Sequence, residues 1–150
     1  MLSTMNQSPA IPANLGWRLV ALIYDLLPLL ALWLLTSGLL LLARGGTPVT
    51  PGSATAIVVF ALLWLVSGAY ATLSWRRGGQ TIGMRPWRLR VVDAQGNDPS
   101  WRAVWLRYLV ATLSLATFGL GFFWALFDPQ RRTWHDLAAG TLLVRLSRRA

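Results

Sequence analysis

Three long apolar segments dominate this chain of 150 residues and limit what it can fold into. They run from about Trp17 to Ala43, from about Ala54 to Trp75 and from about Ala103 to Phe127. Each exceeds the ~20 residues that a helix needs to cross the ~30 Å hydrocarbon core of a bilayer. Only 13% of the residues are charged, whereas a soluble domain has about 25%. The chain is therefore predicted to be an all-α integral membrane protein, built as a bundle of three apolar helical segments.

The ends of the chain differ from its middle. Residues 1–16 contain no basic residue and are rich in Ser, Asn and Pro, which predicts a disordered N-terminal lead. A cleaved signal peptide would begin with a positively charged region, so we expect the first apolar segment to be retained. Residues 17–146 are predicted to form the membrane domain, and residues 147–150 a basic C-terminal tail.

Arginine alone supplies the net charge of +9, because the chain contains no lysine. Basic residues collect in cytoplasmic loops, so the arginine-rich loop after the second segment predicts a multi-pass protein of the bacterial inner membrane with a cytoplasmic N-terminus. This distribution argues against nucleic acid as a partner. The arginines that are also candidates for binding anionic headgroups at the membrane surface are Arg76, Arg77, Arg85, Arg88 and Arg90.

The third segment raises a conflict of topology. If it simply crosses the membrane, Arg131, Arg132 and Arg145 lie on the side opposite the arginine-rich loop, against the rule that basic residues face the cytoplasm. A break at Gly119 or Gly121 into a helical hairpin would return the tail to the cytoplasmic side. Non-helical backbone at that depth is tolerated only where protein shields it. Both topologies stay open at this point.

Short cytoplasmic strands are predicted in the loop between the second and third segments. Residues 87–93 partly alternate apolar and polar side chains, and residues 94–99 carry a turn signal with glycine, asparagine and proline. The glycine-rich stretch at residues 78–83 lacks the spacing of a phosphate-binding loop and does not follow a strand. It is therefore interpreted as a turn at the end of the second segment.

Arg18 and Asp25 are the unusual residues of the first segment. They are seven positions apart, so on a helix they share nearly one face and lie about 10.5 Å apart along the axis. An ionised aspartate inside the hydrocarbon costs about 2.5–3.5 kcal/mol on insertion scales and normally faces the bundle interior. Asp25 is therefore either an ion or proton site or part of a structural ion pair. Arg107 in the third segment is a secondary candidate as a partner of Asp25 or Asp136, although no spacing rule selects it.

Other polar residues give weaker signals. His135, the single histidine, could accept a proton, or it could be an interfacial residue with a local hydrogen bond. No metal site is expected, because one histidine, no cysteine and five scattered aspartates do not form a ligand cluster. Since no catalytic arrangement or cofactor fingerprint is recognisable, we expect a protein without a cofactor that is not an enzyme.

Three motifs occur in order: WRLVALIYD at residues 17–25, GQTIGMR at residues 79–85 and RTWHDLAAGT at residues 132–141. Together they resemble the RDD family of bacterial membrane proteins. The resemblance covers residues 15–146. Met84 departs from it, because the family commonly has lysine there, and Trp87–Arg88 replaces a small or apolar pair.

The resemblance implies roles for named residues. Arg18 and Asp25 match the arginine and the first aspartate of the family name, and Asp136 matches the second, with Asp93 and Asp128 as fallback candidates. It implies a membrane protein with suspected transport of a cation, a proton or an unknown ligand, for which three spans would require a homo-oligomer. The alternative is a non-transporting structural or accessory protein in which the set forms a packing salt-bridge network.

The same resemblance bears on topology. If Arg18 is to meet Asp136, the last motif must lie on the cytoplasmic side. Residues 140–144 could then pair as a strand with residues 89–92, which favours a third segment that returns.

Overall fold

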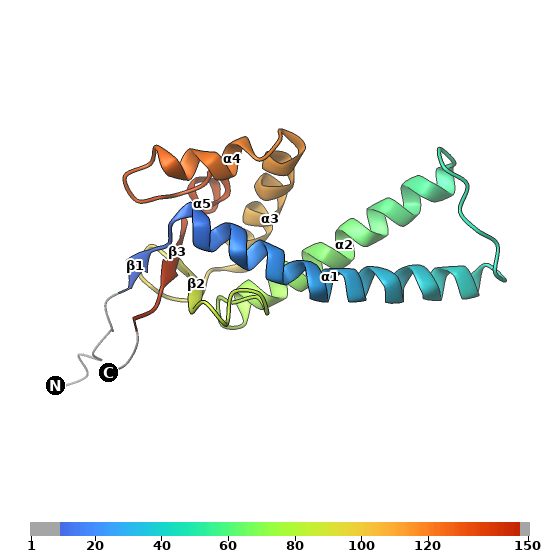
Figure 1. Ribbon diagram of the computed structural model, residues 1–150, viewed down its shortest axis with the longest axis horizontal. Coiled ribbons are helices and arrows are strands. Elements are labelled where there is room, and N and C mark those ends of the chain that lie inside the picture. The colour runs from blue at the N-terminus through green and yellow to red at the C-terminus, as the bar shows by residue number, and fades with distance from the viewer. Residues whose placement is uncertain (1–9, 148–150) are drawn as a thin grey trace.

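In the computed structural model, which describes residues 10–147, two long helices form a hairpin that extends away from the rest of the chain (Figure 1). Helix α1 spans Leu15–Ala43 and α2 spans Ala54–Arg76. Both are long and apolar enough to cross a membrane, and their ends lie within two residues of the predicted ones. Residues 1–9 of the predicted lead and residues 148–150 of the predicted tail lie outside the described part.

Side-chain caps set where both helices begin. Asn14 precedes α1, and its Oδ1 accepts a hydrogen bond from the backbone N–H of Trp17 at 3.1 Å. Ser53 precedes α2, and its Oγ accepts from the backbone N–H of Ala56 at 3.2 Å. Both caps satisfy a backbone donor that the first turn of a helix leaves free. Residues 44–53 connect the two helices and form neither a helix nor a strand.

The third apolar segment is bent rather than straight. Helix α3 spans Trp101–Ala116, α4 spans Leu120–Phe123, and the 3-10 helix η1 continues over Trp124–Leu126. The two parts meet at 108°. Gly119 lies at the bend with φ 78°, a left-handed conformation that glycine adopts without steric cost. The predicted break at Gly119 is therefore confirmed, although it produces roughly a right angle and not a hairpin of two parallel arms.

Gly121 has a different role from the predicted one. It lies inside α4, where a Cβ would stand 2.8 Å from Cβ of Ser114 and 2.8 Å from the ring of Trp134. Such distances leave no room for a side chain. Gly121 is needed for close packing of α4, and the prediction that it breaks the segment is wrong.

A three-stranded antiparallel sheet confirms the predicted strands. Strand β2 spans Leu89–Asp93, β3 spans Thr141–Arg145 and β1 spans Ile11–Pro12, in the order β1-β3-β2. Val91 pairs with Leu143 in the centre of the β2–β3 ladder. The pairing predicted between these two segments is therefore present.

Strand β1 corrects the predicted disorder of residues 10–16. Pro12 pairs with Val144, and the N–H of Ala13 donates to the carbonyl of Leu143 at 2.9 Å. Ala13 is also almost completely buried. A two-residue strand has no alternation that a sequence pattern could reveal, and here the partner strand orders it.

The sheet brings three distant parts of the chain together (Figure 1). β1 precedes α1, β2 follows α2, and β3 follows the short helix α5 (Trp134–Ala139). Since α1 leads away from the sheet and α2 leads back, the bent segment α3–α4–η1 begins and ends on the sheet's side of the hairpin. By length and composition, this bent segment fits one broken span or a re-entrant element.

The hydrophobic core is small and lies where α1 meets the sheet. It comprises one turn of α1, the loop before β2 and the inner faces of β2 and β3. Its buried members are Ala13, Ala21, Met84, Leu89, Val91 and Leu143, with Trp17, Trp75 and Trp87 packed against them.

Candidate functional site

Asp136 binds two arginines that come from separate helices. Its Oδ2 lies 2.8 Å from Nη1 of Arg18 on α1, and its Oδ1 accepts a hydrogen bond from Nη1 of Arg107 on α3. All three residues are buried, Asp136 completely. We call Arg18, Arg107 and Asp136 the Asp136 centre. The expected contact of Arg18 with Asp136 is present, and Arg107, for which no spacing rule was available, completes it.

The position of Asp136 follows from the start of α5. Thr133 is the N-cap, and its Oγ1 accepts from the backbone N–H of Asp136 at 3.4 Å. In return, Oδ2 of Asp136 accepts from the backbone N–H of Thr133 at 3.1 Å. This reciprocal capping box satisfies two backbone donors of the first turn. The same carboxylate therefore starts a helix and binds two arginines.

Further contacts spread the Asp136 centre over most of the fold. Nη2 of Arg18 donates to the carbonyl of Arg131 at 2.8 Å. Nη1 of Arg107 donates to Oγ1 of Thr141 on β3 at 2.9 Å, and the Arg107 guanidinium lies 5.0 Å from the ring centroid of Trp75 on α2. A guanidinium at this distance over an indole is attracted to its face. The centre thus connects α1, α2, α3, α5 and β3.

Burial and the charges of the Asp136 centre shift the pKa values of His135 and of Asp136 itself. Burial alone would raise the pKa of the Asp136 carboxyl, but the guanidinium groups of Arg107 and Arg18 outweigh it and hold that pKa below its ordinary value. Burial, reinforced by Arg107, lowers the pKa of His135 well below its ordinary value. Asp136 is therefore ionised and His135 neutral at physiological pH.

His135 is a buried residue and not an interfacial one. It is 4% exposed, and its ring centroid lies 4.9 Å from that of Phe122 in an edge contact. Its Nδ1 is buried and makes no hydrogen bond within residues 10–147. The interpretation of His135 as an interfacial residue with a local hydrogen bond is therefore wrong.

Asp25 belongs to a second, separate cluster with Tyr70, Thr81 and Gly83, which we call the Asp25 cluster. Its Oδ1 accepts from the hydroxyl of Tyr70 on α2 at 2.6 Å and from the backbone N–H of Gly83 at 2.9 Å. Its Oδ2 accepts from the hydroxyl of Thr81 at 2.6 Å. Within the described residues no salt bridge to Asp25 forms, so the network expected to join Arg18, Asp25 and Asp136 is divided. The physical reason is that two turns of α1 separate Arg18 from Asp25, and each meets a different part of the chain.

The loop after α2 is shaped to reach Asp25. A Cβ on Gly83 would lie 2.7 Å from Cγ of Asp25 and would also meet the carbonyl of Ala21. The carbonyl of Gly79 accepts from the N–H of Val91 at 2.7 Å, which fixes the loop to β2. The glycine-rich stretch is thus a turn, as predicted, with a specific partner on α1.

Two members of the Asp25 cluster escaped sequence reasoning. Tyr70 is one of few hydroxyl-bearing residues in an apolar helix, and Thr81 lies inside the second motif. Those signals mark polar positions, but no spacing rule relates them to a carboxylate on another helix.

The fallback aspartates lie in turns. Oδ1 of Asp93 accepts from the backbone N–H groups of Gln95 and Asn97, at 2.9 and 2.8 Å. Oδ2 of Asp128 accepts from Nε of Arg132 at 3.0 Å, and that hydrogen bond lowers the pKa of the carboxyl. Neither aspartate reaches the Asp136 centre, so both serve local structure.

The predicted surface arginines do not form one patch. Arg90 pairs with Asp98 at 2.8 Å, and the Arg76 guanidinium lies 5.9 Å from the ring centroid of Trp101. Arg77 and Arg85 are exposed, whereas Arg88 is half-buried. Within residues 10–147, no three His, Cys, Asp or Glu residues are grouped closely enough to hold a metal ion.

Comparison with known proteins covers most of the chain. The sequence model described as the RDD family matches residues 12–140. An uncharacterized protein of Rickettsia prowazekii (strain Madrid E) is 31% identical over 90 residues, which cover 59% of this chain and 50% of that protein. The match thus spans about half the length of that curated relative. No solved structure matches this chain.

Proposed function

The chain belongs to the RDD family, and on that premise we propose that it is a multi-pass protein of the bacterial inner membrane with a structural or accessory role. Family membership and two helices long and apolar enough to span a bilayer point to a membrane protein. In the proposed role, the Asp136 centre locks the sheet and short helices onto the membrane hairpin.

One observation carries this proposal: both oxygens of the Asp136 carboxylate accept hydrogen bonds from its own chain. It accepts from Arg18, Arg107 and the backbone N–H of Thr133 while 0% exposed. A buried carboxylate whose lone pairs are so engaged has little capacity left for a passing ion. Removing one partner from a buried ion pair typically costs about 3–5 kcal/mol, because the other charge is left uncompensated. The Asp136 centre would therefore hold together the helices and the strand that it contacts.

The proposed orientation places the sheet in the cytoplasm. Arginines that follow α2 and η1 lie on the sheet's side of the hairpin, whereas the linker of residues 44–53 at the other end carries Arg44 alone. Basic residues favour the cytoplasmic side. The N-terminus, the sheet and α5 would then be cytoplasmic.

The lock is tested by comparing Asp136→Asn with Asp98→Asn. The control removes the same charge from the partly exposed pair with Arg90, whose side chains are each 35% exposed, and exposed pairs contribute about 0–1 kcal/mol. Asp136→Asn should reduce accumulation of the protein in membranes and its thermal midpoint in detergent, and Asp98→Asn should change neither. Equal behaviour of the two variants would refute the lock.

A second candidate, cation or proton exchange, rests on the Asp25 cluster. The side-chain and loop donors that bind Asp25 are all uncharged, so within the described residues its negative charge has no ion-pair partner. A buried carboxylate of this kind in a spanning helix is a functional-site candidate by default. A single chain offers few helices for a solute path, so this function would require a homo-oligomer.

Flux through proteoliposomes distinguishes the two candidates. An exchanger should show pH-dependent cation flux that Asp25→Asn abolishes while the protein accumulates normally. Reduced assembly of Asp25→Asn, without flux in the wild type, would leave the structural role as the function of both clusters.

A further inference from the structure

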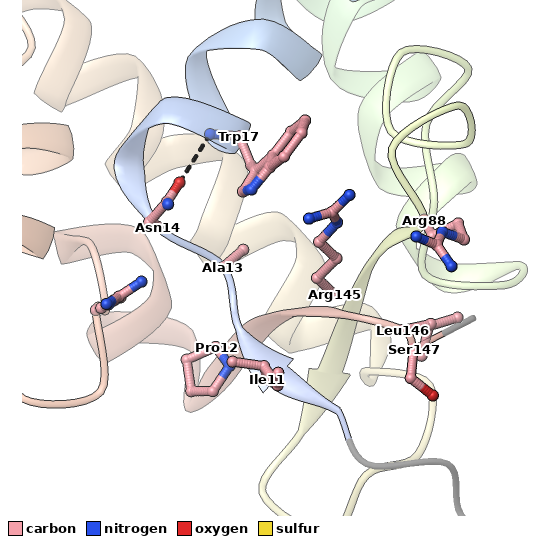
Figure 2. Close-up of a pocket in the computed structure, with 10 residues that line it drawn as sticks. Ile11, Pro12, Ala13, Asn14, Trp17, Arg88, Arg145, Leu146 and Ser147 are labelled. Carbon is pink, nitrogen blue, oxygen red and sulfur yellow. Dashed lines mark hydrogen bonds between the residues drawn. The ribbon is translucent and has the colours of Figure 1, made fainter. Parts of the chain in front are cut away.

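We propose that the cavity between the start of α1 and the end of β3 binds the phosphate group of an anionic ligand. The cavity has a volume of about 210 Å³, and its lining includes Trp17, Arg88, Arg131 and Arg145 (Figure 2). This inference goes beyond the proposed lock, because none of these four residues belongs to the Asp136 centre or to the Asp25 cluster.

Charge is the first argument. Three arginines line the cavity, and among its lining residues within the described part of the chain there is no carboxylate. Asp128, which lies nearby in sequence, is already paired with Arg132 at 3.0 Å. The cavity therefore holds uncompensated positive charge, and such a concave surface concentrates anions.

Unsatisfied donors are the second argument. Nε of Arg145 and Nη1 of Arg88 are buried, and neither makes a hydrogen bond within the described residues. Buried donors in native proteins nearly always have a partner, and a bound ion or water is one way in which such a donor is satisfied. A phosphate oxygen is a partner whose charge and geometry suit a guanidinium.

The Arg145 side chain is held in place by stacking on an aromatic ring. Its guanidinium lies 4.0 Å from the ring centroid of Trp17, and the Trp17 ring lies 5.2 Å from that of Trp87. Figure 2 shows the side chain rising from β3 toward Trp17. An arginine stacked in this way loses less freedom on binding than an unrestrained one.

Backbone strain is the third argument. Within residues 10–147, three residues other than glycine have positive φ, and two of them, Arg88 at 55° and Arg131 at 56°, line this cavity. Such conformations cost free energy and cluster at binding sites. The backbone carbonyl of Arg131 accepts from Arg18, and that of Arg88 from the N–H of Leu146. The turns therefore fix both backbones and leave the side chains for a ligand.

The start of α1 adds to the attraction. Asn14, the N-cap, also lines the cavity, and the first turn of this 29-residue helix contains no acidic residue. The positive end of the helix dipole thus faces the same region. Since one water molecule occupies about 30 Å³ of liquid, the cavity can hold a phosphate group with its first ester carbons.

Two sources could supply such a phosphate. α1 enters its apolar stretch directly beyond Trp17, so an anionic phospholipid headgroup lies within reach of the cavity if α1 spans the membrane. A soluble phosphate or phosphate ester has the same chemistry. The experiment below separates these sources.

The test uses the full chain in phosphatidylcholine nanodiscs and follows the indole N–H resonance of Trp17, assigned with Trp17→Phe. One arm adds inorganic phosphate, and the other replaces phosphatidylcholine by phosphatidylglycerol. A saturable shift in the first arm identifies a site for soluble phosphate, and a shift in the second arm alone identifies a headgroup site. If neither arm shifts the resonance, the proposal is wrong.

Matched variants connect the shift to the cavity. Arg131→Gln with Arg145→Gln should weaken binding about 25-fold, because each arginine near an anionic surface contributes about fivefold. Arg77→Gln with Arg102→Gln removes the same charge from exposed positions outside the lining and should change affinity less than twofold. Equal losses of affinity in the two double variants would show that binding depends only on the net charge of the protein, and this would overturn the proposal.

The single variant Arg131→Gln tests the cavity with a substitution that should not disturb folding. The Arg131 side chain is exposed, and its structural contact uses the backbone carbonyl, so this variant should fold. It should bind about fivefold more weakly, and unchanged binding would contradict the proposal.

Discussion

The Arg18 guanidinium and the Asp136 carboxylate, from opposite ends of the chain, lie 2.8 Å apart and are almost completely buried. This contact joins the first turn of α1 to α5. It makes the Asp136 centre a property of the whole fold and not of one segment.

A double-mutant cycle should show that Arg18 and Asp136 are coupled. Asp136→Asn should destabilise the protein by about 3–5 kcal/mol, because it leaves two buried arginines without their carboxylate. Arg18→Gln should cost less, because Asp136 keeps its pairing with Arg107. The double variant should be more stable than the sum of the two losses predicts, by about 0.5–3 kcal/mol. Reversible unfolding in mixed micelles measures the free energies, and additive losses would show that the contact contributes nothing.

His135 should make stability depend on pH. Its folded-state pKa is lowered, whereas the unfolded chain takes up a proton near pH 6.5. Stability is therefore complete above about pH 6.5 and falls as the pH drops below it, by at most about 1.4 kcal/mol per pH unit. Thermal midpoints of the wild type and His135→Leu between pH 7.5 and 5 test this, and the variant should show a flatter profile.

Asp136 does not confound that measurement. Its folded-state pKa is also lowered, so its contribution is complete above the unfolded value of about 3.9 and is lost only below it. A decline that persists unchanged in His135→Leu would assign the effect to another group.

Gly83→Ala should loosen the contact between the loop and α1. The added Cβ would meet Cγ of Asp25 at 2.7 Å and the carbonyl of Ala21, and overpacking of this kind costs about 1–3 kcal/mol. Gly38→Ala is the matched control, because a Cβ there has nothing within 4 Å and alanine favours the helix. Thermal melting should separate the two, and an equally stable Gly83→Ala would show that the contact can relax.

Cysteine labelling should establish the path of the bent segment. The chain contains no cysteine, so Thr50→Cys, Gln95→Cys and Gln130→Cys each place one thiol in an exposed turn. In intact spheroplasts an impermeant maleimide should label Thr50→Cys alone, and the other two only after lysis. If Gln130→Cys reacted like Thr50→Cys, α3–α4–η1 would cross the membrane.

The sequence predicts the parts of this fold that depend on local pattern. Apolar length locates α1 and α2. The bend at Gly119 follows from the conformational freedom of glycine, and the β2–β3 pairing from two short apolar strands between turns.

Contacts between distant elements carry no such pattern. Arg18 and Asp25 share one face of one helix, yet their side chains meet different partners because α5 lies against one turn and residues 81–83 against another. Arg107 reaches Asp136 only because α3 packs against α5, and Tyr70 reaches Asp25 only because α2 packs against α1. The pairing of these charges therefore depended on tertiary structure.

The order of the sheet also constrains biosynthesis. β3 is the middle strand, and β1 and β2 each pair with it and not with one another. A nascent chain that has inserted α1 and α2 still lacks the strand that both edges require, and it lacks Asp136 as well. The sheet and the Asp136 centre can form only after Asp136 and β3 have been synthesised. A chain that stops before residue 136 would carry two strand edges without their shared partner and two arginines without the carboxylate that pairs them.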